Sequence, residues 1–211
     1  MRKILIIGSG AQAKYVLENF INNEKYLVNG ILPLTNNSLK WVKFYNIKIY
    51  NGKDFLEIVK KNKLYGVIVC EFNSKIKKKI INKIKKNKIR LVSSIHKDAS
   101  ISHKSRISKG VIINAGVVVQ PFSSIGVGCM IHANSIIEHD VKISSYVNIS
   151  PGVNIAGHVK VGSFTNIYTG STIINNCKIG SECIIGAGSV VISNIKSKSK
   201  FAGVPAKSIK Y

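Results

Sequence analysis

Apolar side chains recur at every sixth position over the second half of the chain. From Ile101 to Val191, all sixteen positions spaced by six residues are Ile or Val. This period fits neither an α-helix, which repeats about every 3.6 residues, nor a half-buried strand, which repeats about every two. Self-similarity at one fixed period is instead typical of a repeat architecture, in which each short unit buries its apolar face on its neighbours.

The position two residues before each repeated Ile or Val is small or β-branched. These positions hold Ala99, Ser105, Val111, Val117, Ser123, Cys129, Ser135, Val141, Val147, Val153, Val159, Thr165, Ser171, Cys177, Cys183 and Ser189. Such side chains suit the corners of a narrow prism. Directly after the repeated residue come Gly126, Gly162, Gly180 and Gly186, which we expect to supply the unusual dihedral angles that corners need. The repeat resembles the hexapeptide repeat of the left-handed parallel β-helix, in which three hexads make one coil and residues 18 apart stack.

The first half of the chain carries a different pattern. Apolar runs predict strands over residues 3–7, 28–34, 46–50, 66–70 and 89–92, and they alternate with helical patterns over residues 11–20, 52–62 and 73–87. This alternation predicts a small parallel sheet with helices on both faces. Isoleucines at 76, 80, 81 and 84 are expected to form the apolar side of the last helix, with lysines such as Lys77 on its solvated face. The segment 93–99 is the expected boundary with the repeat.

Positive charge dominates the composition, with 32 lysine and arginine residues, 9 aspartate and glutamate residues and a formal net charge of +23. Such a balance can indicate nucleic-acid or anionic-membrane binding. The basic residues are scattered, however, and no arginine stripe with aromatic residues or other nucleic-acid motif is present. We therefore favour an anionic small-molecule substrate, and we expect no nucleic-acid or membrane partner.

The cysteines and the N-terminal residues suggest a cytoplasmic protein. Cys70, Cys129, Cys177 and Cys183 show no paired metal-ligand spacing, and three of them fall on the small inward series. We therefore expect buried thiols rather than metal ligands or nucleophiles. The opening residues do not form a signal peptide, and no apolar stretch reaches membrane-spanning length.

A strand, a glycine turn and a helix open the chain. The turn Gly8–Ala13 follows the first apolar run, and its backbone N–H groups and helix dipole would suit a phosphate. A dinucleotide site would need a third glycine, which Ala13 could replace, and an acidic residue after the second strand, but residues 28–34 contain no acid. We therefore favour a nucleotide-sugar site or plain strand–helix packing over a nicotinamide or flavin site.

One histidine in the repeat has acidic neighbours on both sides. Residues 99–211 contain only three acids, and two of them, Glu138 and Asp140, flank His139. Because His139 lies two places past the repeated Ile137, it should lie near a corner of the prism. The triplet is either a solvated corner or a general base oriented by a carboxylate. Stacking by 18 residues sets Gly157 beside His139, where a glycine allows close approach of a ligand and offers an N–H.

The other histidines lack flanking acids. We expect His103 and His132 at surface or corner positions and His96 at the domain junction. His158 is a partial exception, because its neighbour Gly157 lies one coil above His139.

Four stretches together relate the whole chain to a known family. They are Ile6–Lys14, Ser94–His96, Glu138–Asp140 with Val147–Gly152, and Gly203–Lys207. The chain resembles the bacterial sugar acyltransferases of the sialic-acid O-acetyltransferase and UDP-amino-sugar N-acetyltransferase type. The resemblance implies an α/β N-terminal Rossmann-like domain over residues 1–95, which would bind a nucleotide-sugar. It implies a left-handed parallel β-helix (hexapeptide repeat) with a C-terminal tail over residues 96–211, which would transfer the acetyl group.

The resemblance also implies roles for individual residues. His139 would be the catalytic base, and Asp140 would raise its basicity. Acetyl-CoA would be the co-substrate and would lie in a groove between adjacent subunits of a homotrimer. The groove would be lined by Asn148, Gly157, Thr169, Ala187, Pro205 and Lys207, with the N–H of Gly157 facing the thioester oxygen. The nucleotide-sugar would touch Gly10, Ala11 and Gln12.

The chain departs from the family pattern in three places. The usual Gly-His of the first loop is Ala11-Gln12, and the usual acidic pair after the second strand is replaced by Leu32-Pro33-Leu34. A common histidine is replaced by Asn148. The first two departures bear on the nucleotide, whereas the third alters one contact of the CoA groove and leaves the base in place.

The leading hypothesis is N-acetylation of the amino group of a nucleotide-activated sugar for surface glycans. O-acetylation of a sialic acid or a related sugar hydroxyl is the alternative within the same chemistry. A non-catalytic coil for trimeric assembly or binding is the alternative from another class. The acid-flanked His139 opposite Gly157 argues against the last one, because a scaffold has no need of it.

Overall fold

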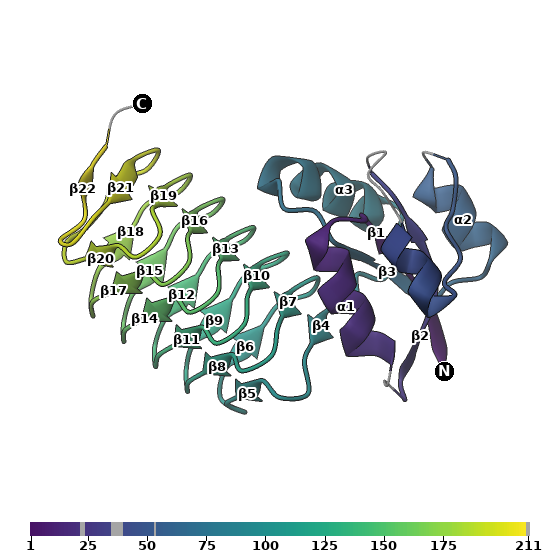
Figure 1. Ribbon diagram of the computed structural model, residues 1–211, viewed down its shortest axis with the longest axis horizontal. Coiled ribbons are helices and arrows are strands. Elements are labelled where there is room, and N and C mark those ends of the chain that lie inside the picture. Colours follow the sequence, from purple (N-terminus) through teal and green to yellow (C-terminus); the bar gives the residue numbers. More distant parts are fainter. Residues whose placement is uncertain (22–23, 35–39, 53, 210–211) are drawn as a thin grey trace. The chain divides into compact units, whose positions relative to one another are not determined.

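A computed structural model describes residues 1–21, 24–34, 40–52 and 54–209, so residue 53 of the predicted helix over 52–62 lies outside the described residues. The chain divides into two units, Met1–Ser94 and Ile95–Tyr211. Figure 1 shows helices and strands alternating in the first unit and short strands stacked in rows in the second. The two apolar periods read from the sequence therefore correspond to two kinds of structure.

The N-terminal unit is built on a small parallel sheet. Its elements are β1 (Arg2–Ile7), α1 (Ala11–Ile21), β2 (Tyr26–Leu32), the 3₁₀ helix η1 (Lys40–Tyr45), α2 (Phe55–Lys61), β3 (Gly66–Val69) and α3 (Ser74–Lys86). The strands lie in the order β2–β1–β3, and both pairs are parallel. The strands predicted over 46–50 and 89–92 are reduced to single parallel bridges, Ile31 to Ile49 and Val67 to Leu91. The parallel arrangement is thus confirmed, and the two outer segments are less regular than predicted.

Local side-chain chemistry sets where two of the helices begin. The Asn73 side chain accepts hydrogen bonds from the backbone N–H groups of Lys75 and Ile76 at 3.1 and 3.2 Å, which caps α3. Asp54 caps α2 in the same way by accepting from the N–H of Leu56 at 3.1 Å. Both residues satisfy backbone donors that the first helical turn leaves unpaired.

The buried face of α3 differs from the predicted one. Lys77, which was expected on the solvated face, is only 1% exposed, and Ile76, which was expected on the apolar side, is 45% exposed. The buried positions of α3 are Ser74, Lys77, Ile81 and Ile84, spaced three, four and three residues apart. The aliphatic stem of a lysine can cover apolar surface. The helix therefore buries a regular helical stripe that includes one lysine instead of the stripe richest in isoleucine.

The repeat folds into a left-handed parallel β-helix with three faces (Figure 1). The first face contains β4 (Ser94–Ile95), β7 (Ile112–Ile113), β10 (Met130–Ile131), β13 (Asn148–Ile149), β16 (Asn166–Ile167), β19 (Ile184–Ile185), β21 (Lys200–Ala202) and β22 (Lys207–Ser208). The second face contains β5 (Ser100–Ile101), β8 (Val118–Val119), β11 (Ile136–Ile137), β14 (Asn154–Ile155), β17 (Thr172–Ile173) and β20 (Val190–Val191). The third face contains β6 (Arg106–Ile107), β9 (Ser124–Ile125), β12 (Lys142–Ile143), β15 (Lys160–Val161) and β18 (Lys178–Ile179). Paired residues such as Ile137 and Ile155 are 18 apart, as predicted.

The interior of the β-helix is the predicted apolar series. Every repeated Ile or Val from Ile113 to Val191 is at most 3% exposed, whereas Ile101 and Ile107, in the first coil, are partly exposed. The small series fills the remaining interior space, and Cys129, Val141 and Thr165 are fully buried. Each coil therefore buries its apolar residues on the coils before and after it.

The corners use their glycines differently from the prediction. A positive φ recurs three residues past the repeated Ile or Val, as at Asp140 (59°), Gly152 (68°) and His158 (62°), and not directly after it. The expected dihedral role of Gly126, Gly162, Gly180 and Gly186 is therefore wrong. A Cβ on Gly162 would instead lie 2.4 Å from the backbone nitrogen of Ser181. Close approach of the next coil is what excludes a side chain there.

Candidate active site

One corner of the β-helix brings the acid-flanked histidine and the predicted glycine together. His139 and Asp140 directly follow Glu138 at the end of β11, and Gly157 and His158 occupy the equivalent corner after β14, one coil further on. The N–H of His158 donates to the carbonyl oxygen of His139 at 3.1 Å. The stacking of coils therefore positions these four residues, and no long-range loop is needed.

His139 and Asp140 contact each other at the surface. Nδ1 of His139 lies 3.0 Å from Oδ2 of Asp140, and the two side chains are 51% and 42% exposed. An ionised carboxylate only accepts hydrogen bonds, so the proton of a neutral imidazole in this contact sits on Nδ1. Nε2 then keeps its lone pair, which is the arrangement that a general base requires.

Gly157 places bare backbone against the imidazole. A Cβ at this position would lie 2.7 Å from both Cε1 and Nε2 of His139, so any side chain would collide with the ring. Gly157 is buried, and among the described residues no protein atom accepts a hydrogen bond from its N–H. This corner therefore places Nε2 of His139, which can accept a proton, beside the backbone N–H of Gly157, which can donate a hydrogen bond.

The second acidic neighbour takes no part in this contact. The carbonyl oxygen of Glu138 accepts a hydrogen bond from Oγ of Ser123 at 2.6 Å. Among the described ion pairs, His139 is joined to Asp140 and not to Glu138. Only one of the two flanking acids therefore orients the histidine.

His158 is a neighbour of the base that the sequence analysis noted only for its preceding glycine. Its ring meets that of His139 edge to face, with centroids 5.0 Å apart and an interplanar angle of 86°. Among the described residues, His139, Asp140 and His158 form a group whose potential metal-ligating atoms all lie within 4.8 Å of one another. The 18-residue stacking could have revealed this residue, because 140 + 18 = 158.

Four of the residues expected to line the CoA groove lie away from His139 on the same chain. Thr169 and Ala187 are exposed in successive corners after β16 and β19, joined by the hydrogen bond from the N–H of Gly188 to the carbonyl oxygen of Thr169 at 2.8 Å. Pro205 and Lys207 are exposed in the C-terminal tail. These four residues thus lie on a different corner from His139 and in the tail.

Asn148 is in a different environment from the other four. It lies on β13, is only 1% exposed, and donates from Nδ2 to Oδ1 of Asn166 at 2.8 Å. Its side chain belongs to a partly buried polar pair on the first face of the β-helix.

The predicted nucleotide-sugar residues lie where β1 leads into α1. Gly10 and Ala11 are exposed, Gln12 is half-buried, and the N–H of Ala13 donates to the carbonyl oxygen of Gly10 at 3.0 Å. The hydroxyl of Ser9 is buried and has no hydrogen-bond partner among the described atoms. Open donors at the start of a helix beyond a parallel strand can receive an anion.

A cleft lies at the carboxyl ends of β1 and β2. It has a volume of about 360 Å³ and is lined by Ile7, Leu32, Pro33, Leu34, Gly52, Phe55, Lys79, Ile80 and Lys83. Ligands of parallel α/β sheets bind at this edge. The lining is apolar, with two lysines as its charged members.

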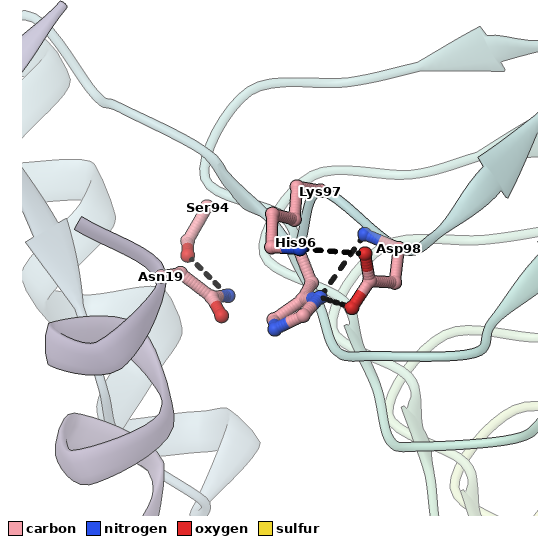
Figure 2. Close-up of polar contacts among 5 residues, drawn as sticks. All are labelled: Asn19, Ser94, His96, Lys97 and Asp98. Atoms are coloured by element: carbon pink, nitrogen blue, oxygen red, sulfur yellow. Dashed lines mark hydrogen bonds and ion pairs between the residues drawn. The ribbon is translucent and has the colours of Figure 1, made fainter. Parts of the chain in front are cut away.

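Two other histidines are accounted for by local contacts. His132 was expected at the surface or at an exposed corner, but it is only 9% exposed, with Nδ1 3.4 Å from Nδ2 of Asn114. Figure 2 shows Nδ1 of His96 beside Asp98, whose backbone N–H donates to it at 3.1 Å. The same figure shows Asn19 donating to Oγ of Ser94 at 2.9 Å within the N-terminal unit.

The cysteines lie out of reach of solvent. All four are free and buried, as predicted. Burial raises the pKa of the Cys70 thiol and that of the Cys177 thiol, so both stay protonated at neutral pH.

Among the described residues, no helix has both the length and the apolar character that crossing a membrane requires. The longest, α3, carries seven lysines.

Comparisons with known proteins agree with the fold of the repeat. Residues 158–193 match the bacterial transferase hexapeptide (six repeats) family. No curated protein matches the chain in sequence.

Two solved structures are similar over the full length. A histidine-to-alanine mutant of GDP-perosamine N-acetyl transferase from Caulobacter crescentus, in complex with CoA and GDP-perosamine, has 27% identity and a TM-score of 0.90, covering 100% of this chain and 98% of that one. The acetyltransferase domain of PglB from Neisseria gonorrhoeae, in complex with acetyl coenzyme A, has 26% identity and a TM-score of 0.87, covering 99% of each chain. The chain therefore carries the bacterial transferase hexapeptide repeat in its β-helix and is similar over its full length to solved bacterial sugar N-acetyltransferase structures.

Proposed function

We propose that the protein transfers the acetyl group of acetyl-CoA to the amino group of a nucleotide-activated amino sugar. The observation that carries the proposal is the corner where the His139–Asp140 pair faces the bare backbone of Gly157. The similar full-length structures from Caulobacter crescentus and Neisseria gonorrhoeae, which hold CoA with GDP-perosamine or acetyl coenzyme A, support the same chemistry.

His139 acts as the general base. The Asp140 carboxylate accepts a hydrogen bond from the N–H at Nδ1 and so holds the ring in the tautomer whose Nε2 has a free lone pair. Nε2 takes a proton from the sugar amine as its nitrogen bonds to the thioester carbon, and it returns that proton to sulfur as the carbon–sulfur bond breaks. A well-placed base contributes about 10²- to 10⁴-fold to the rate.

Gly157 stabilises the charge that develops during this transfer. Its N–H lacks a protein partner among the described residues, and its missing side chain lets the thioester lie against the backbone beside His139. A fixed backbone donor aimed at a developing oxyanion lowers the barrier more than the same donor in water would. No covalent acetyl-enzyme is needed, because the amine attacks the thioester directly.

Acetyl-CoA binds in a groove completed by a neighbouring subunit. Thr169 and Ala187 share one corner of the chain and His139 lies on another, so the two sets meet across the interface of a homotrimer. Pro205 and Lys207 close the far end of the groove, and Asn148 supports its wall through Asn166. Exposed apolar side chains on the second face and at its corners, Ile136, Ile174 and Ile192, support such an interface.

The N-terminal unit acts as a Rossmann-like domain that binds the nucleotide-sugar. Gly10, Ala11 and Gln12 surround the start of α1, where the diphosphate would meet backbone N–H groups. The apolar cleft beside Leu32 and Phe55 is large enough for a nucleoside base. The four free, buried thiols are consistent with action in the reducing cytoplasm.

Thiol release from acetyl-CoA tests the proposal directly. The acceptors are UDP- and GDP-linked 4-amino sugars, with free sialic acid as the hydroxyl alternative. We expect release with an amino-sugar nucleotide, and release with sialic acid alone would replace the amine by a hydroxyl acceptor. His139→Ala should lower kcat by at least about 10²-fold while the circular dichroism and the mass by light scattering stay unchanged. A variant that keeps the full rate would remove His139 from the mechanism.

A further inference from the structure

The corner that carries the proposed base holds a third ligand-type side chain that the acetyl transfer does not use. His139, Asp140 and His158 offer one ligating atom each, all within 4.8 Å of one another. Asp140 and His158 are the equivalent positions of successive corners, with φ of 59° and 62°. The stacking of the two coils, and not a flexible loop, therefore holds the three side chains together.

The types of ligand in this group are those that Zn²⁺ prefers. Two imidazoles and one carboxylate, with water as the fourth ligand, form an open zinc site. Because zinc ligands lie about 2.0–2.2 Å from the ion, the most widely separated of these atoms, which lie within 4.8 Å of one another, must move closer together, whereas Nδ1 of His139 and Oδ2 of Asp140 are already 3.0 Å apart. The side chains have room to do so, because those of His139 and Asp140 are 51% and 42% exposed.

Other soft ligands in the chain do not compete for the ion. The four thiols are buried, and burial raises the pKa of Cys70 and Cys177, so these sulfurs stay protonated. Among the described residues, His139, Asp140 and His158 are the one group of three His, Cys, Asp or Glu side chains that lie close enough together to bind the same metal ion.

We propose that His139, Asp140 and His158 bind one Zn²⁺ ion per chain and that the bound ion reversibly switches off acetyl transfer. Zinc on Nε2 of His139 would occupy the lone pair that accepts the substrate proton. Zinc on Nδ1 would leave the proton of the neutral imidazole on Nε2, so that no lone pair is available there either. The loss of activity rests on the proposed function, whereas the metal site does not.

Binding is tested on the metal-free full-length chain. Zinc is titrated calorimetrically, and Co²⁺ is added separately to follow the visible absorption of a low-symmetry cobalt site. We expect one ion per chain, and at least about tenfold weaker binding in His158→Asn, because one of three protein ligands is lost. Asparagine tolerates the positive φ at this position. The matched control is His103→Asn, which changes an exposed corner histidine outside the cluster and should bind like the wild type.

The activity arm uses the same variants with acetyl-CoA and an amino-sugar nucleotide. Zinc should inhibit the wild type and a chelator should restore the rate, whereas His158→Asn should keep its zinc-free rate and need at least about tenfold more zinc for half inhibition. Equal zinc affinity in wild type and His158→Asn, or binding without inhibition, would overturn the proposal. If no acceptor is acetylated, the proposed function fails, and calorimetry with the cobalt spectrum still decides whether the site exists.

Discussion

The two units of this chain differ in how directly their residues reveal their environment. In the β-helix, the repeated positions from Ile113 to Val191 are buried as the period predicts. In the N-terminal unit, Lys77 is buried and Ile76 is exposed, which reverses the expectation for both. In a repeat the same residue type occupies the same position in every coil, and equivalent residues pack on one another. A single helix against a sheet can instead rotate about its axis until the side chains that pack best are buried. The repetition is why burial could be predicted from the sequence more reliably in the β-helix than in the N-terminal unit.

The largest expected effect compares one isoleucine from each unit. Ile155→Ala removes a side chain that is 1% exposed inside a coil and should destabilise the fold by about 2–5 kcal/mol. Ile76→Ala on α3, at 45% exposure, should change stability by no more than about 0.5 kcal/mol. Urea denaturation of both variants measures the difference. Similar losses of unfolding free energy in the two variants would contradict the difference in burial between the two units.

Two corners of the β-helix should differ in whether a glycine tolerates a side chain. In Gly157→Ala the new Cβ would lie 2.7 Å from Cε1 and Nε2 of His139, so the ring must move away by about 1 Å. Because a misplacement of about 1 Å costs about 10²-fold in rate, we expect kcat to fall by about that factor. Gly152→Asn is the matched control, because its φ of 68° suits asparagine and open space lies around its Cβ. The measurements are the steady-state kcat and the melting temperature of both variants. A lower kcat in Gly157→Ala alone, with unchanged melting temperatures, would support a catalytic role for this corner. A full rate for Gly157→Ala would contradict the contact.

The carboxylate beside the base should matter less than the base. Asp140→Asn keeps the size of the side chain and suits the φ of 59°, but its amide can donate to Nδ1 and favour the tautomer with the proton on Nε2. Because the pair is half exposed and screened, we expect roughly a 10- to 100-fold lower kcat. The zinc-free pH–rate profile of the two proteins measures this effect. Identical profiles would limit Asp140 to metal binding.

The smallest expected effect lies in the N-terminal unit. The N–H of Leu56, followed by the ammonium of Lys83, lowers the pKa of Asp54 at the start of α2. Its stabilisation is present above the unfolded pKa of about 3.9 and is lost as the pH falls through the lower folded value. Asp54→Asn should therefore lose less stability than the wild type on acidification below about pH 4. Melting temperatures from pH 7 to 3 should converge, and parallel curves would contradict the ion pair.

Much of the proposed site followed from the spacing of the repeat together with its resemblance to a coil of three hexads. The 18-residue coil placed Gly157 beside His139, and the same arithmetic applied to Asp140 would have found His158. Spacing did not show that Asp140 rather than Glu138 meets the imidazole. That choice depends on the left-handed backbone of the corner, which sets the direction in which each side chain leaves the chain.

The sequence by itself predicted the inward apolar series, because a period of six places one Ile or Val in every short strand, and the resemblance to the hexapeptide repeat predicted the β-helix and the coil that carries His139. Only the tertiary structure decided which face of α3 is buried, why Gly162 and its equivalents lack side chains, and that the rings of His158 and His139 meet edge to face. These depend on the approach of segments distant in the chain to within van der Waals distance. A pattern along one chain does not encode such distances.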